Sequence, residues 1–160
     1  MRKNNLKTIS DAVPWALGWH AGFGQDFMSR ADGYPGFSKA YGLKFDRQPR
    51  EMDLSLTYRA LASGELDLIA GNSTDGLIAA LDLFQLEDDR LYFPPYQAVF
   101  IGRLEITDSL NEVFEGLTNA ISTDEMRRLN YEVDGNKRTP KDVVNQWIAE
   151  KFGSVISKLK

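Results

Sequence analysis

The apolar positions of the first hundred residues switch between helical spacing and short continuous runs. Residues 52–62 place apolar side chains on one face of a helix of about three turns, and Gly64 closes it. Apolar runs at residues 19–23 and 67–71 predict short buried strands. Strands that alternate with helices predict an α/β sheet with helices on its faces.

Weaker patterns predict the remaining elements of this part of the chain. Short helices are expected at residues 11–15, capped by Thr8 or Ser10, at residues 25–30, at residues 37–41, closed by Gly42, and at residues 77–81. Further strands are expected at residues 43–45, 83–86 and 98–101. The sequence predicts a solvated turn at Glu87–Arg90 and an extended crossing segment at Phe93–Tyr96, where two prolines stiffen the backbone.

The last third of the chain has helical patterns. Helices are expected at residues 108–117, at residues 124–131 after a cap at Ser122 or Thr123, and from Pro140 to Phe152. We expect a single domain over residues 1–160, with an α/β core at 1–95 and a crossing strand and C-terminal helices at 96–160.

Composition narrows the classes of function. A chain of 160 residues with 42% hydrophobic residues can bury a real core. Its net charge of -4 argues against nucleic acid as a partner. The absence of cysteine excludes disulfides, zinc-thiolate sites and cysteine nucleophiles. The only histidine is His20, so a histidine-rich metal site is excluded, and no cofactor is expected.

Membrane and export signals are not expected in these 160 residues. No apolar run approaches the roughly 18 to 20 residues that span a bilayer. The basic start is not followed by the apolar stretch of a signal peptide. On this basis alone a cytoplasmic location is possible.

Two loops combine a strand end with a helix start. Gly22, Phe23 and Gly24 form either a tight turn that needs small residues or a seat for a ligand carboxylate, since free N–H groups and the helix dipole favour an anion there. Residues 72–76 occupy the equivalent position in an α/β sheet. There Asn72, Ser73, Thr74 and Asp75 either contact a ligand or only cap the following helix.

Several single residues could bind a ligand or a metal, and each also has a simpler structural explanation. Arg30 could bind a carboxylate through two hydrogen bonds, or be an ordinary surface arginine. Tyr96 could stack on a cation, or be a hinge tyrosine packed in the core. The carboxylates of residues 87–89 lack the spacing of a calcium loop, which favours a solvated charge run and no metal site. His20 is expected to be a satisfied core residue rather than a catalytic base.

Eight segments, taken together and in order, resemble the substrate-binding proteins of ABC importers for glycine betaine, choline and carnitine. They are TISD at 8–11, GFGQDF at 22–27, RADGYPG at 30–36, YGLKF at 41–45, STDG at 73–76, EDDR at 87–90, FPPY at 93–96 and LNYEV at 129–133. The resemblance covers nearly the whole chain, and corresponds to the second lobe of a two-lobed family member followed by its C-terminal segment.

The resemblance implies a fold and a function. It implies a lobe like that of the type II periplasmic binding proteins, with a mixed sheet, flanking helices and a helical C-terminal segment. The implied function is non-catalytic recognition of a small zwitterionic or cationic osmoprotectant during transmembrane transport. The importer's membrane subunits are then partners, and the implied location is periplasmic or otherwise extracytoplasmic.

The resemblance also assigns residues. Family members hold the quaternary ammonium in an aromatic box and the carboxylate with an arginine and backbone groups. By position, Tyr96 matches a box tyrosine and Arg30 matches the carboxylate arginine. The residue before STDG is often a box tyrosine in the family, and here it is Asn72.

Two other functions remain open at this point. A lobe that has lost ligand binding would act as an interaction module, through a homodimer or a domain swap of its C-terminal helices. An enzyme using His20 or the pair Asp88 and Asp89 is the least favoured, because the sequence offers no credible nucleophile and base pair.

Overall fold

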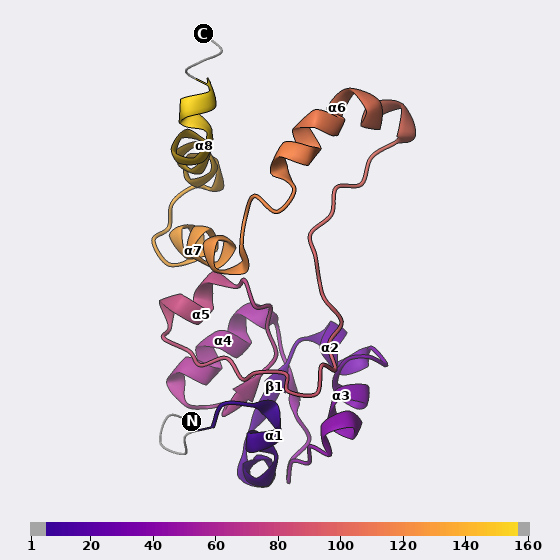
Figure 1. Ribbon diagram of the computed structural model, residues 1–160. Coiled ribbons are helices and arrows are strands. Elements are labelled where there is room, and N and C mark those ends of the chain that lie inside the picture. Colours follow the sequence, from indigo (N-terminus) through magenta and orange to yellow (C-terminus); the bar gives the residue numbers. More distant parts are fainter. Residues whose placement is uncertain (1–5, 157–160) are drawn as a thin grey trace. The chain divides into compact units, whose positions relative to one another are not determined.

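Two units make up the chain in the computed structural model, which describes residues 6–156 (Figure 1). Unit 1 runs to Asn72 and includes Leu81–Pro94, and unit 2 consists of Ser73–Ala80 and the chain from Pro95 onward. The expected single domain over residues 1–160, divided near residue 95, stays a prediction.

A small parallel sheet lies at the centre of unit 1. Its strands are β1 (Ala21–Phe23), β2 (Arg50–Glu51) and β3 (Leu68–Ile69), in the order β2-β1-β3. Gly22 of β1 is paired with Arg50 and with Ile69, both in parallel register. The α/β class is confirmed, but both described pairings are parallel, whereas we expected a mixed sheet.

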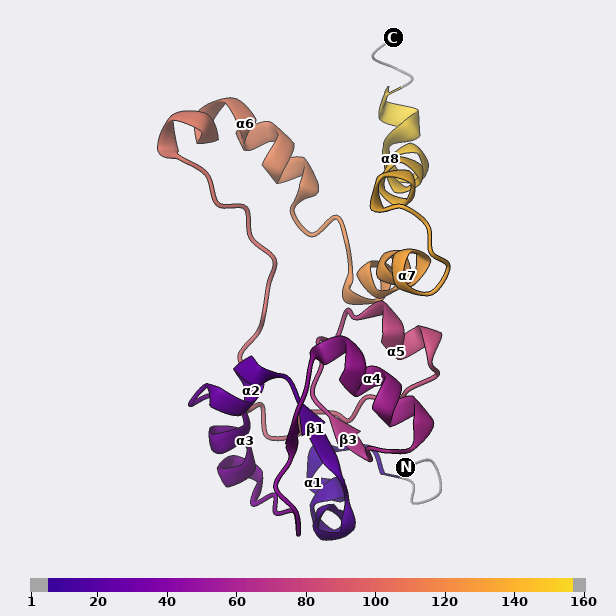
Figure 2. The ribbon, with the colours of Figure 1, turned by 180° about the vertical axis from the view of Figure 1, so that it is seen from behind.

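Helices connect these strands, because parallel neighbours require crossover connections. The helical elements of unit 1 are α1 (Ile9–Ala12), the 3-10 helix η2 (Val13–Gly18), α2 (Gln25–Ser29), α3 (Tyr34–Tyr41) and α4 (Leu54–Ser63). Figure 2 shows β1 beside β3, with α4 packed against both strands. The predicted helices are therefore present, although α3 begins at Tyr34, three residues early, because Pro35 is tolerated in a first turn.

Local chemistry explains where these helices begin and end. The Thr8 hydroxyl accepts a hydrogen bond from the Asp11 N–H at 3.1 Å, and the Asp11 carboxylate accepts one from the Thr8 N–H at 3.0 Å. This capping box confirms Thr8 as the cap of α1. Gly42 and Gly64 end α3 and α4 at φ +68° and +80°, a left-handed conformation that favours glycine.

Three predicted strands are wrong. At residues 43–45 the apolar side chains reflect burial, since Leu43 is 4% exposed and its N–H caps α3 by donating to the Ser38 carbonyl. Residues 83–86 form no strand, and the neighbouring Glu87 makes only an isolated parallel bridge with Thr8. Residues 98–101 have no strand partner within the described part of the chain.

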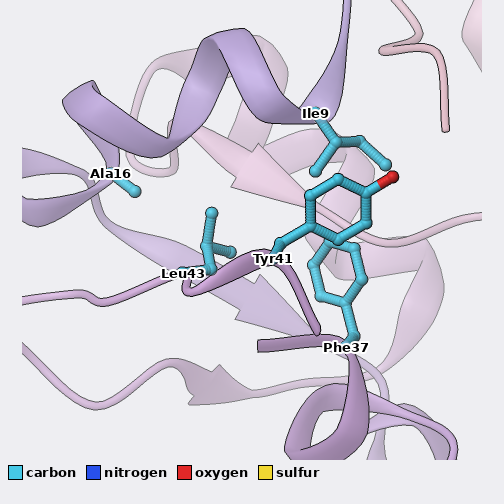
Figure 3. Close-up of a cluster of buried hydrophobic side chains, with 5 residues drawn as sticks. All are labelled: Ile9, Ala16, Phe37, Tyr41 and Leu43. Carbon is cyan, nitrogen blue, oxygen red and sulfur yellow. The ribbon is translucent and has the colours of Figure 1, made fainter. Parts of the chain in front are cut away.

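The core of unit 1 is rich in aromatic rings. A buried cluster joins the first helical elements to α3 and the chain after it, and its members are Ile9, Ala16, Phe37, Tyr41 and Leu43 (Figure 3). The Tyr41 ring lies beside the Phe37 ring, with centroids 5.3 Å apart. These contacts fix the position of α3. The loop at residues 30–33 leads directly into this helix.

Unit 2 is helical, as expected for the last third of the chain. Its helices are α5 (Gly76–Ala80), α6 (Leu104–Leu117), α7 (Thr123–Asp134) and α8 (Pro140–Ile156). The Ser122 hydroxyl caps α7 by accepting from the Glu125 N–H at 3.2 Å. A second core cluster contains Leu129, Val143 and Trp147. Over residues 6–156, no helix has both the length and the apolar character needed to cross a membrane.

Candidate functional site

The end of β1 carries the first predicted site residues. At Gly22 an added Cβ would lie 2.4 Å from Cδ1 of the buried Leu66, so a larger residue there would displace this packed side chain. The Phe23 side chain is 1% exposed and packs against the Phe27 ring at 5.2 Å, which leaves only its backbone for a ligand. At Gly24, which caps α2, an added Cβ would meet nothing within 4 Å. Packing therefore does not explain this glycine.

Arg30 is held by a carboxylate of its own loop. Its Nε and Nη2 donate to the two Asp32 carboxylate oxygens at 2.9 and 2.6 Å. Both side chains are more than half exposed, at 53% and 62%. The hydrogen bond from Arg30 keeps the pKa of Asp32 below its ordinary value. Because both side chains are exposed, water and salt screen this ion pair.

The loop that carries Arg30 is tied to the segment before the two prolines. The Tyr92 hydroxyl donates to the Asp32 carbonyl at 3.0 Å. A Cβ on Gly36 would lie 2.3 Å from this hydroxyl, and one on Gly33 would lie 2.1 Å from the Phe27 carbonyl oxygen. The two glycines of the RADGYPG motif are therefore explained by close approach rather than by ligand contact.

Asp88 is not the solvated residue that we expected. Its carboxylate accepts hydrogen bonds from the Tyr41 hydroxyl and from the N–H groups of Tyr92 and Phe93, the last two at 3.1 and 2.9 Å. Burial alone would raise the pKa of Asp88, but these hydrogen bonds outweigh it and keep the pKa below its ordinary value. The segment that contains Asp88 therefore contacts the end of α3, and the Asp88 carboxylate holds the backbone of Tyr92 and Phe93 there.

Arg90 adds further contacts between this segment and the end of α3. Its N–H donates to the Tyr41 hydroxyl at 3.0 Å, its Nη1 donates to the Ala40 carbonyl at 2.6 Å, and its guanidinium lies 5.0 Å from the centre of the Tyr41 ring. Burial and the bond to Asp88 raise the pKa of Tyr41 to about 12.

The STDG loop belongs to unit 2, where α7 holds it. Arg127 Nε donates to the Ser73 carbonyl and Asn130 Nδ2 donates to the Thr74 carbonyl, each at 2.8 Å. Gly76 lies so close to the backbone of Asn130 that a Cβ would approach it to 2.5 Å. Two motifs of the resemblance, STDG and LNYEV, thus contact each other. Sequence reasoning did not single out Arg127 or Asn130, although Asn130 lies inside the second motif.

Tyr96 is exposed. Its side chain is 78% accessible and follows Pro95 in a segment that forms neither helix nor strand. Of the two alternatives for Tyr96, a hinge tyrosine packed in the core is therefore wrong, and contact with a cation stays a prediction. Asn72 is also exposed and ends the first stretch of unit 1.

The predicted site residues are divided between the units. Unit 1 contains Gly22, Phe23, Gly24, Arg30 and Asn72, and unit 2 contains Ser73, Thr74, Asp75 and Tyr96. Within unit 1, the end of β1 and the Arg30 loop both adjoin α2, at its first and last residues. Ligand contact by any of these nine residues stays a prediction.

His20 is not a core residue. Half of its side chain is exposed, and its ring Nε2 lies 3.2 Å from Nη1 of Arg47. The backbone N–H of His20 donates to the Asp67 carboxylate at 2.8 Å. Among the residues that the structure describes, no three histidine, aspartate or glutamate side chains are arranged to hold a metal ion.

Comparison with known proteins identifies relatives of known role. Residues 1–150 match the family OpuAC, described as the substrate binding domain of ABC-type glycine betaine transport systems. The carnitine transport binding protein OpuCC of Listeria monocytogenes is 38% identical and aligns with 92% of this chain and 49% of its own length. The ergothioneine transport permease/ergothioneine binding protein EgtU of Helicobacter pylori is 34% identical over 95% of this chain and 28% of its own length.

Solved structures agree. A glycine betaine/carnitine/choline ABC transporter structure is 40% identical, with a TM-score of 0.81 over 93% of this chain and 56% of its own. Apo YehZ from Escherichia coli, at 22% identity and a TM-score of 0.69, supports the fold alone.

These comparisons confirm the resemblance drawn from the eight segments and the periplasmic-binding-protein type of fold. The chain spans about half the length of OpuCC, the carnitine-binding relative. It belongs to the family of substrate-binding domains of ABC-type glycine betaine transport systems.

Proposed function

We propose that this chain is a ligand-recognition lobe that binds a small zwitterionic or cationic molecule of the quaternary ammonium kind. The observation that carries the proposal is Arg30, whose exposed guanidinium already holds a carboxylate, that of Asp32, through two hydrogen bonds. A bidentate pair of this geometry is how arginine recognises carboxylates in general. The names of the relatives, which include carnitine and glycine betaine, support the same class of ligand.

The two ends of such a ligand need different chemistry. In this proposal Arg30 and the backbone of Gly22, Phe23 and Gly24, all in unit 1, receive the carboxylate. The family resemblance supports the exposed Tyr96 ring as a contact for a cation. A cation over one aromatic ring gains about 0.5 to 2 kcal/mol, whereas micromolar affinity requires about 8 kcal/mol. Further contacts from residues 72–75 are therefore part of the proposal.

The role that we propose is binding without catalysis. His20, the only histidine, lies beside the Arg47 guanidinium, an arrangement that supplies no nucleophile for a base to activate. In a substrate-binding protein the partners are the importer's membrane subunits, and the working location is extracytoplasmic. Both belong to the proposal for this chain.

Calorimetric titration of the chain with glycine betaine, carnitine and choline tests the proposal. Arg30→Ala should weaken glycine betaine and carnitine at least about tenfold, because a charge-assisted pair is lost, and should leave choline, which has no carboxylate, unchanged. Arg50→Ala is the matched control, since it removes another exposed arginine, which lies 4.0 Å from Glu65. Tyr96→Ala should weaken all three ligands by more than about 1 kcal/mol.

Two results of these titrations would count against the proposal. The absence of saturable binding with all three ligands would contradict the proposal for this chain. Equal losses for Arg30→Ala and Arg50→Ala would remove Arg30 from the site.

A second candidate function, an interaction module, is favoured by one observation. Three consecutive apolar side chains, Val99, Phe100 and Ile101, are 72%, 64% and 93% exposed. Apolar surface of this kind is typical of a segment that another polypeptide covers. In this candidate the chain forms a homodimer or exchanges C-terminal elements with a second copy.

A further inference from the structure

The Asp88 carboxylate fixes the backbone immediately before the two prolines. One oxygen, Oδ2, accepts from the Phe93 N–H at 2.9 Å, and the other, Oδ1, accepts from the Tyr92 N–H at 3.1 Å and from the Tyr41 hydroxyl. Three donors converge on one carboxylate, and two of them belong to consecutive residues. Since Tyr41 is the last residue of α3 and is 2% exposed, this arrangement anchors residues 92 and 93 to a fixed part of the core.

Tyr92 extends this anchor to the Arg30 loop. With its backbone held by Asp88, its side chain packs against the buried Phe37 ring at 5.9 Å and its hydroxyl donates to the Asp32 carbonyl at 3.0 Å. A Cβ on Gly36 would lie 2.3 Å from this hydroxyl, so the glycine allows the close approach. A shift of the Tyr92 backbone would therefore move its hydroxyl relative to the Asp32 carbonyl of the Arg30 loop.

Asp32 makes the final connection. Its carbonyl accepts from Tyr92, and its carboxylate accepts from Nε and Nη2 of Arg30 at 2.9 and 2.6 Å. A displacement of the Asp32 backbone thus moves the guanidinium with it. Bidentate recognition is sensitive to such displacement, because both hydrogen bonds must keep their direction.

We propose that Asp88 is a positioning residue for Arg30 and acts through the Tyr92 hydroxyl and the backbone of Asp32. This inference deepens the proposed function and rests on it for the ligand. The position of the Arg30 side chain can be measured without any ligand.

The adjacent carboxylate supplies a matched control. Asp89 Oδ1 accepts from the Ser10 N–H at 3.1 Å and so ties this turn to α1 instead of to the Arg30 loop. Asp88→Asn and Asp89→Asn make the same chemical change one residue apart. Only the first interrupts the connection to Arg30.

The first experiment records the Nε–H signal of Arg30 in ¹⁵N-labelled protein by NMR. Tyr92→Phe keeps the ring and deletes the hydroxyl that reaches Asp32, so it tests the connection even if Asp88→Asn fails to fold. We expect Asp88→Asn and Tyr92→Phe to shift this signal and to speed its hydrogen exchange about two- to tenfold, and Asp89→Asn to leave it unchanged. An unchanged Arg30 signal in folded Tyr92→Phe would overturn the inference.

The second experiment titrates the same variants with carnitine and choline. Tyr92→Phe should weaken carnitine about two- to tenfold and leave choline unchanged, since only carnitine presents a carboxylate to Arg30. Equal losses for both ligands would overturn the positioning role at the ligand. If the wild-type chain binds neither ligand, the proposed function fails, and the NMR result still decides whether Asp88 positions Arg30.

Discussion

Tyr41 uses both hydrogen-bonding functions of its hydroxyl in the interior of unit 1. It donates to Asp88 and accepts from the Arg90 N–H at 3.0 Å, while its ring is 2% exposed. Tyr41→Phe should lower the free energy of unfolding by about 1 to 3 kcal/mol, because Asp88 loses a donor and the Arg90 N–H loses its acceptor. Urea denaturation followed by circular dichroism measures this change.

Tyr34→Phe is the control for this prediction. It keeps the ring contact with Phe23 at 5.3 Å and removes a hydroxyl that lies outside the Asp88 cluster. If the two variants unfold at the same urea concentration, the Tyr41 hydroxyl does not stabilise the fold in the way described.

Asp88 should also give unit 1 a dependence on acid. Its pKa is lower in the folded chain than the ordinary value of 3.8, so the unfolded chain binds the proton more readily. Its stabilising contribution is therefore present above that value and is lost as the pH falls through the lower pKa of the folded state. Thermal unfolding of the wild type and of Asp88→Asn between about pH 2 and 6 checks this. The difference between them should shrink in acid, and a difference that does not depend on pH would contradict the prediction.

Among the helices, α3 and α4 end at glycines whose positive φ other residues adopt only with strain. Gly42 has φ +68°, and an added Cβ would meet no atom within 4 Å, so any cost of Gly42→Ala comes from the backbone. We expect a loss of about 1 to 2 kcal/mol in the free energy of unfolding. Gly18→Ala is the control, because Gly18 has the same open surroundings without a positive φ. Equal stability of the two variants would contradict this account of the helix end.

The helices of this chain could be predicted from sequence because their signals are local. A capping residue such as Thr8 or Ser122 and a closing residue such as Gly42 act within one turn, so a short stretch of sequence contains the whole cause. Strands lack such signals. Leu43 and Ile101 both occur in apolar runs, yet the first is buried against helices and the second is exposed. Only a distant partner decides whether such a run becomes a strand.

At the candidate site, too, residues in local motifs could be predicted and long-range contacts could not. Arg30 and Tyr96 could be named because short motifs resemble those of a family, and both prove to be exposed. The residues that hold the loops were missed or misjudged, because each has a partner far away in sequence. Asn130 donates to the Thr74 carbonyl, and Asp88 accepts from the Tyr41 hydroxyl. A hydrogen bond to a carbonyl or N–H leaves no pattern in the sequence of the segment that receives it.

At the scale of the whole molecule, the exposed segment at residues 97–101 should govern self-association. Its five residues carry no charge, and Val99, Phe100 and Ile101 have strand-forming side chains. Such a segment favours pairing with another chain, because its apolar side chains are exposed and it lies outside any strand. Light scattering at rising concentration should therefore give an average mass above that of one chain.

Charge on this segment should reverse the effect. Lysine on an exposed strand opposes edge-to-edge pairing, so the double variant Val99→Lys and Ile101→Lys should return the mass to that of one chain. Leu17→Lys, at a 55% exposed position in unit 1, should leave the association of the wild type unchanged. A wild-type mass equal to one chain at every concentration would contradict the interaction candidate. Association that survives the lysine pair would place the contact on another surface.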